Sequence, residues 1–287
     1  MTDAALTRFH APEAAVRGNR SHALAACAAC VLALVAIVVA GLLCSDAATS
    51  TDLSAKFMAP SVAHVFGTDQ LGRDMLARTL AGLSRSVLIG LVAAACSSVI
   101  ALVLGTAAAL GGPRVDAVVT WGIDLMMGIP HIVLLILISF ALGKGVVGVT
   151  VGVALTHWPS LTRVVRAEVL QAKQSRHVAV AGALGAGRGR IALVHMLPAV
   201  FPQFLVGLVL LFPHAILHEA AITFLGFGLP PEMPAIGVIL SESMSYLAAG
   251  SWWLALFPGL ALVAVVMLFD VAGQCARRLL DPHQAQR

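Results

Sequence analysis

Six apolar runs, most of them about 20 residues long, constrain this chain more than any other feature. An α-helix needs roughly 20 apolar residues to cross the hydrocarbon core of a bilayer. Hydrophobic residues make up 59% of the chain and charged residues only 11%, which excludes an ordinary soluble domain with its charged fraction of about 25%. The sequence therefore predicts an all-α integral membrane protein with six transmembrane helices. The candidate spans are Ala23–Cys44, Val87–Leu110, Val118–Leu142, Val146–Leu161, Ala199–Thr223 and Trp252–Ala272.

The positions of Lys and Arg predict the orientation, because cytoplasmic loops carry an excess of these residues. Most of the 18 cations fall in the two terminal segments, at Arg114 and in residues 163–198. We therefore expect both termini and residues 163–198 to lie in the cytoplasm. The resulting parts are a cytoplasmic tail (1–22), a first anchor (23–44), a periplasmic segment (45–86), a core (87–272) and a cytoplasmic C-terminal tail (273–287).

Several short motifs, in one order along residues 20–283, resemble a known family. They include the segments His64–Arg78, Gly111–Asp116, Gly128–Pro130, Glu219–Gly228 and Leu280–Pro282. Their order is similar to that of the inner-membrane permeases of ABC importers for peptides, opines and nickel. The resemblance implies the fold of a type I importer permease. It also implies a second related permease subunit, two ATP-binding subunits and a periplasmic substrate-binding protein as partners.

The chain has no phosphate-binding loop of the G-x-x-x-x-G-K-[ST] type, so we expect it to have no ATPase site and no cofactor of its own. ATP and Mg²⁺ would be bound by the partner subunits. The resemblance implies that a coupling helix within the loop 163–198 contacts the ATPase. Gly185 matches the family's loop motif, whereas Ala179-Val180-Ala181 stands where the family has Glu-Ala-Ala. The residues expected to contact the ATPase are Arg176, Ala179, Ala181, Leu184, Gly185 and Arg188.

Ionisable residues at membrane depth indicate functional positions, because they are costly there. Four such residues are predicted to lie on the substrate path, namely Asp124, His214, His218 and Glu219. His214 and His218 are four residues apart, on one helical face, and could transiently hold a borderline cation such as nickel. Hydrogen bonding between helices is the alternative role for these histidines.

The histidine pair ahead of Phe224-Leu225-Gly226 resembles the nickel-type permeases, and nickel or a nickel chelate is therefore the expected cargo. A dipeptide or oligopeptide cargo is the alternative within the same family. An intramembrane metalloenzyme is a further alternative, but Glu219 follows the histidine pair rather than lying inside it, as it would in a zinc protease helix. A stand-alone channel or secondary transporter would be favoured by inverted repeats, and none is evident.

Overall fold

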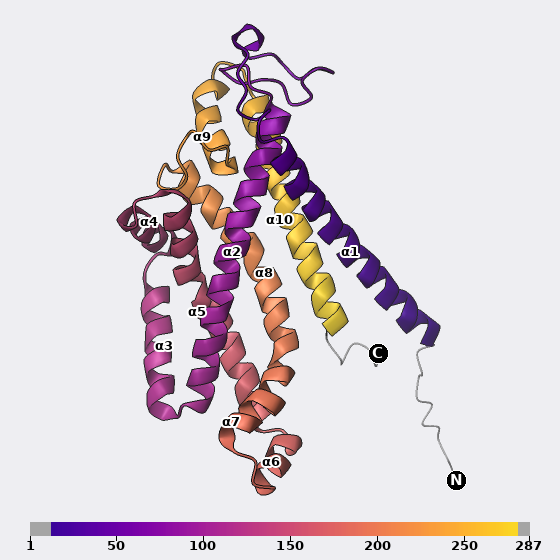
Figure 1. Ribbon diagram of the computed structural model, residues 1–287, viewed down its shortest axis with the longest axis vertical. Helices are drawn as coiled ribbons and strands as arrows, with labels where there is room; N and C mark the ends of the chain where they lie inside the picture. Colours follow the sequence, from indigo (N-terminus) through magenta and orange to yellow (C-terminus); the bar gives the residue numbers. More distant parts are fainter. Residues whose placement is uncertain (1–12, 281–287) are drawn as a thin grey trace, which may run out of the picture.

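The computed structural model describes residues 13–280, without the side chains of residues 13–20 and 188. Helices account for most of these residues, and β-structure among them is limited to one isolated bridge between Thr68 and Asp74. Figure 1 shows the long helices running side by side. In order, the elements are α1 (Glu13–Leu43), η1 (Leu53–Ala55), α2 (Met75–Leu110), α3 (Pro113–Gly128), α4 (His131–Ala141), α5 (Gly145–Lys173), α6 (Arg176–Ala183), α7 (Arg188–Ile191), η2 (Ala192–Met196), α8 (Leu197–Phe224), α9 (Ile236–Leu247) and α10 (Trp253–Leu280).

Four of these helices are long and apolar enough to cross a membrane, namely α2 and α10 together with the ranges Ser21–Leu43 and Gly189–Phe224. A fifth crossing is possible if α3 and α4 are counted as one bent span. The fourth predicted span, Val146–Leu161, lies in α5, which continues into the polar residues up to Lys173. The described residues therefore contain four or five spans by length and composition, and the predicted count of six is not confirmed.

The predicted third span, Val118–Leu142, is broken rather than continuous. α3 ends at Gly128 and α4 begins at His131, with a bend of 95° between them. Pro130 lies at the break, and a proline disfavours helical backbone in the residue before it. Ile129 is accordingly extended, with φ −93° and ψ 136°. This break turns the start of α4 toward the neighbouring helices.

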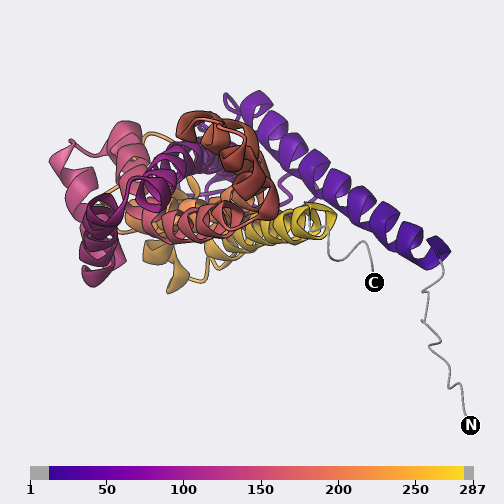
Figure 2. The ribbon, with the colours of Figure 1, turned by 90° about the horizontal axis from the view of Figure 1, so that it is seen from below.

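The helix packing depends on close approaches at small residues. α2 is central and packs against α1, α5 and α8. A Cβ atom at Gly105 would lie 2.8 Å from the Cβ of Val165, so α2 and α5 meet at a distance that only glycine allows. α1 lies on one side of the molecule beside α10, and α3 lies on the opposite side (Figures 1 and 2).

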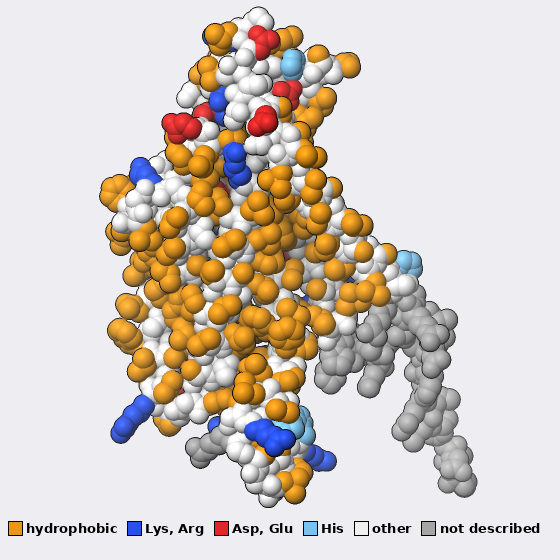
Figure 3. Space-filling view, in the orientation of Figure 1, with side chains coloured by type: hydrophobic (Ala, Val, Ile, Leu, Met, Phe, Trp, Pro, Cys, Tyr) orange, Lys and Arg blue, Asp and Glu red, His pale blue; other side chains and the backbone are white. Residues whose placement is uncertain are grey.

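On the face shown in Figure 3, charged side chains gather toward the two ends of the molecule, and a broad apolar band lies between them. Residues 45–74 and α9 form one end, and α6 with α7 forms the other (Figure 1). At the first end, the buried carboxylate of Asp69 accepts hydrogen bonds from Arg73 Nε and Arg78 Nη1, each at 2.6 Å. Arg78 also bonds to Glu242 of α9 at 3.1 Å. The charges around Asp69 therefore form a network of ion pairs at this end of the molecule.

Several predicted boundaries differ from the observed ones, because helices continue past their apolar cores. α1 begins at Glu13, within the predicted tail 1–22, and α10 continues to Leu280, within the predicted tail 273–287. Residues 1–12 and 281–287 of these tails lie outside the described residues. α2 begins at Met75, where Asp74 caps the helix by accepting the backbone N–H of Ala77 at 2.9 Å.

Candidate functional site: a histidine-lined cavity and a terminal helix-turn-helix

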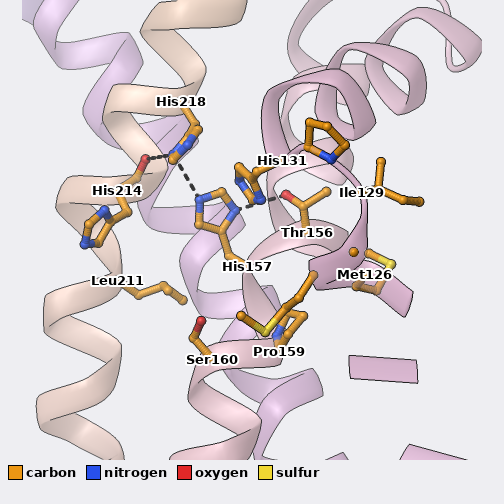
Figure 4. A pocket seen from close by; sticks show the side chains of 13 residues that line it. Met126, Ile129, His131, Thr156, His157, Pro159, Ser160, Leu211, His214 and His218 are labelled. Carbon is orange, nitrogen blue, oxygen red and sulfur yellow. Dashed lines mark hydrogen bonds between the residues drawn. The ribbon is translucent and has the colours of Figure 1, made fainter. Parts of the chain in front are cut away.

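A cavity of about 680 Å³ lies where the break between α3 and α4 meets α5 and α8. Figure 4 shows the side chains that surround it. Four histidines are among them, and the rest are mainly apolar or small. The lining residues are Met126, Met127, Gly128, Ile129, Pro130, His131, Thr156, His157, Pro159, Ser160, Leu211, His214 and His218.

Three of the histidines form a compact cluster. His131 begins α4, His157 lies within α5 and His218 lies within α8. Their ring centroids are 4.4 to 4.9 Å apart, and each ring is edge-on to the other two. One ring nitrogen from each lies within 4.8 Å of one from each of the others. Three separate helices therefore bring three imidazoles to one point on the cavity wall.

Backbone carbonyls orient two of these rings. His157 Nδ1 lies 2.9 Å from the carbonyl oxygen of Val153, and His218 Nδ1 lies 2.7 Å from that of His214. A carbonyl oxygen can only accept a hydrogen bond, so each Nδ1 carries the proton and donates it. The Nε2 atoms of both rings are then left with a free lone pair. His157 Nε2 receives a further, longer bond from His218 Nδ1 at 3.3 Å.

His214 occupies a different position from the other three histidines. Its carbonyl holds His218, but its ring lies apart from the cluster (Figure 4). Both predicted histidines of α8 thus line the cavity, whereas only His218 belongs to the group of three. His131 and His157 were not selected from the sequence. Because both lie beside or within apolar runs, the criterion of an ionisable residue at membrane depth could have found them.

The two predicted acidic residues lie away from the cavity wall. Glu219 is fully buried, and its Oε1 accepts a hydrogen bond from Thr223 Oγ1 at 3.0 Å. Asp124 pairs with Arg163 at 2.8 Å, with more than half of each side chain exposed. Neither residue is among those that line the cavity. The predicted place of both residues on the substrate path therefore stays a prediction.

The residues predicted to contact the ATPase lie on and around α6, at the end of the molecule opposite residues 45–74 (Figure 1). α6 ends in a turn in which Ala186 N–H bonds to Ala181 O and Gly185 N–H bonds to Gly182 O, both at 3.0 Å. This is the Schellman arrangement. Gly185 has the required left-handed backbone, with φ +81°, which explains why a glycine lies here.

The outer surface of this turn is apolar and accessible. Leu184 is 82% exposed and Val180 is 57% exposed. Arg176 and Ala179 are exposed as well, and Ala181 is half-buried. The side chain of Arg188 lies outside the described part of the structure. α6 and the turn after it therefore expose Arg176, Ala179 and Leu184 on a protruding helix-turn-helix, with no acidic side chain at position 179.

The family model for binding-protein-dependent transport system inner membrane components matches residues 98–286. A Brucella suis protein described as a peptide permease is 36% identical over 232 residues, covering 80% of this chain and 77% of its own length. A second Brucella suis protein, described as a peptide transport system permease, is 34% identical over 88% of this chain and 84% of its own length. The dipeptide transport system permease protein DppC of Bacillus subtilis is 31% identical, covering 80% of this chain and 72% of its own length.

The fold is also similar to that of a solved structure. One chain of the MetNI methionine ABC transporter, in an inward-facing conformation, superposes with a TM-score of 0.61 at 19% identity. The match covers 72% of this chain and 98% of that chain. At this identity the likeness concerns the fold, and the family follows from the sequence match. The chain belongs to the family of binding-protein-dependent transport system inner membrane components and is a permease subunit of an ABC importer.

Proposed function

We propose that this chain is one of two permease subunits of an ATP-driven importer for short peptides. The observation that carries the proposal is the similarity, at 31 to 36% identity over at least 80% of the chain, to proteins described as peptide or dipeptide permeases. This similarity favours the peptide alternative over nickel, the cargo first expected from the histidine pair. The relatives are described as permeases, which gives the metalloenzyme alternative no support.

In this proposal the chain crosses the inner membrane six times, with α3 and α4 forming one broken crossing and α5 another. Both termini and α6 face the cytoplasm. A related permease subunit, two ATP-binding subunits and a periplasmic binding protein complete the transporter. The exposed apolar turn around Leu184 supports contact with an ATP-binding subunit, because an apolar patch at the end of a helix suits a groove on a partner.

The proposed peptide path passes along the cavity between the α3–α4 break, α5 and α8. A volume of about 680 Å³ lies within the range of small-molecule sites. His214 and His218 are the predicted path residues that line it. A wall of imidazole, hydroxyl and apolar groups could accommodate peptide backbone and varied side chains without binding any one tightly.

Uptake by intact cells tests the proposed cargo. A strain that lacks only this chain is supplied with the wild-type gene or an empty vector, and uptake of a radiolabelled dipeptide is compared with uptake of radionickel. We expect the wild-type gene to restore dipeptide uptake, and this restored uptake to be lost when the gene of the cognate ATP-binding subunit is deleted. Restored radionickel uptake without any gain in dipeptide uptake would contradict the peptide proposal.

A further inference from the structure

We propose that His131, His157 and His218 form a binding site for one divalent transition-metal ion of borderline softness, such as Zn²⁺, Ni²⁺ or Co²⁺. Among the residues that the structure describes, these three are the one group of three or more His, Cys, Asp or Glu side chains placed to hold a metal ion. The inference concerns a metal site in this chain and does not depend on which cargo is transported.

The spacing of the three nitrogens suits a single ion. Metal–nitrogen bonds to histidine are about 2.0–2.1 Å long, so nitrogens around a tetrahedral ion lie about 3.4 Å apart. The observed nitrogens, one from each ring, lie within 4.8 Å of one another. Small rotations of the rings about their side-chain bonds would bring all three to bonding distance.

The hydrogen bonds of His157 and His218 resemble those that prepare histidines for metal binding. A ligating histidine commonly donates its other ring N–H to a carbonyl or carboxylate, which fixes the tautomer and the ring orientation. Here the carbonyls of Val153 and His214 receive the Nδ1 protons at 2.9 and 2.7 Å. The Nε2 lone pair of His218 is thereby free to bind an ion, and that of His157 is held only by the longer bond from His218 Nδ1 at 3.3 Å, which an ion would replace.

His131 supplies the third nitrogen, and its Nε2 atom has no other evident role. This atom is buried and has no hydrogen-bond partner among the described residues. Buried polar atoms are nearly always paired, so an unpaired one calls for an explanation. A metal ion at the centre of the cluster would be bound by this nitrogen together with the other two.

The chemistry of the cluster selects the class of ion. Imidazole nitrogen suits Zn²⁺, Ni²⁺, Co²⁺ and Cu²⁺, whereas Mg²⁺ and Ca²⁺ prefer oxygen ligands. Three neutral ligands leave at least one coordination position open. The cavity borders the cluster and can supply that ligand as water or as an anionic group. An anionic ligand would also reduce the charge of a divalent ion in these apolar surroundings.

Metal titration of the purified chain tests the site. Full-length protein in lipid nanodiscs, without a polyhistidine tag, is titrated with Co²⁺, and the ligand-field absorption reports coordination by the protein. We expect one saturable site per chain in the wild type. The variants His131→Gln, His157→Gln and His218→Gln should each weaken binding at least tenfold, comparable to the loss of a ligand or its support.

His214→Gln is the matched control, because it changes a fourth cavity histidine but keeps the backbone carbonyl that holds His218. We expect its affinity to stay within twofold of the wild type. An absence of saturable binding in the wild type would overturn the proposal. So would undiminished binding by His131→Gln, or a loss of binding in His214→Gln alone, which would favour the adjacent pair of α8 instead.

A chemical measurement on the wild type covers the case in which a variant does not fold. Diethyl pyrocarbonate modifies accessible imidazoles, and mass spectrometry locates the modified residues. We expect Zn²⁺ to slow modification of His131 and His218 at least fivefold while leaving His214 unchanged. Equal modification with and without Zn²⁺ would overturn the site. Dipeptide uptake by cells carrying His131→Gln is measured separately from metal binding. Failure of the metal site and failure of the peptide proposal therefore appear in different measurements.

Discussion

The buried ion pair between Asp69 and Arg78 gives the sharpest stability prediction. The side chains of Asp69 and Arg78 are 2% and 3% exposed, and the bond between them is 2.6 Å long. Asp69 Oδ1 also accepts the backbone N–H groups of Leu71 and Arg73 at 2.8 and 2.9 Å. The substitution Asp69→Asn keeps an acceptor for those N–H groups but removes the charge that compensates the guanidinium of Arg78.

The expected loss follows from what remains around Arg78. Breaking a buried pair by removing one partner costs about 3–5 kcal/mol, because a buried charge loses its compensation. Glu242, 24% exposed and 3.1 Å from Arg78, still compensates it in part. We therefore expect a loss near the lower end, about 3 kcal/mol, in the free energy of unfolding.

Unfolding of the purified full-length chain from mixed micelles by sodium dodecyl sulfate, followed by circular dichroism, measures this loss. Asp124→Asn is the matched control, because the Asp124–Arg163 pair is exposed, at 61% and 51%. Exposed pairs contribute only about 0–1 kcal/mol. A loss below about 1 kcal/mol for Asp69→Asn, or one no larger than that of the control, would refute the reasoning.

Three further substitutions, the first with a matched control, test the packing and the terminal turn. Gly105→Leu should lower the free energy of unfolding by at least about 2 kcal/mol through overpacking against Val165. Gly122→Ala is the control, because its Cβ would meet only one atom, at 3.8 Å, and it should change the unfolding midpoint little. Gly185→Val places a β-branched side chain at φ +81° and should lower dipeptide uptake severalfold at normal membrane levels of the protein. Leu184→Glu puts a charge on an 82% exposed apolar position and should reduce co-purification of the ATP-binding subunit; unchanged co-purification and uptake would exclude this turn as the contact.

The long helices could be predicted from the sequence because their signal is local. Runs of about 20 apolar residues, such as the one in α2, coincide with observed helices. The 95° bend at Ile129 and Pro130 was not predicted, although the proline was visible. Prolines also occur inside α5, α8 and α10 without ending them, so local sequence alone did not indicate which proline breaks a helix.

The site was only partly predictable, because its members come together through tertiary packing. The i, i+4 spacing of His214 and His218 can be recognised within a single helix, and it led to the prediction that these two residues hold a cation. The cluster of His131, His157 and His218 depends on how α4, α5 and α8 meet, which no spacing in the chain encodes. Conversely, Gly185 was predicted to contact the ATPase through the family resemblance. The structure supplies the physical reason for a glycine at this position, because the backbone there is left-handed.

Reconstitution of the complete transporter tests the central claim most directly. This chain, its partner permease and the ATP-binding subunits are assembled in proteoliposomes with the binding protein outside and ATP inside. The account predicts accumulation of labelled dipeptide in the lumen that requires ATP hydrolysis and is abolished when this chain is omitted. Accumulation that continues without this chain, or ATP hydrolysis that no peptide-loaded binding protein stimulates, would contradict the account.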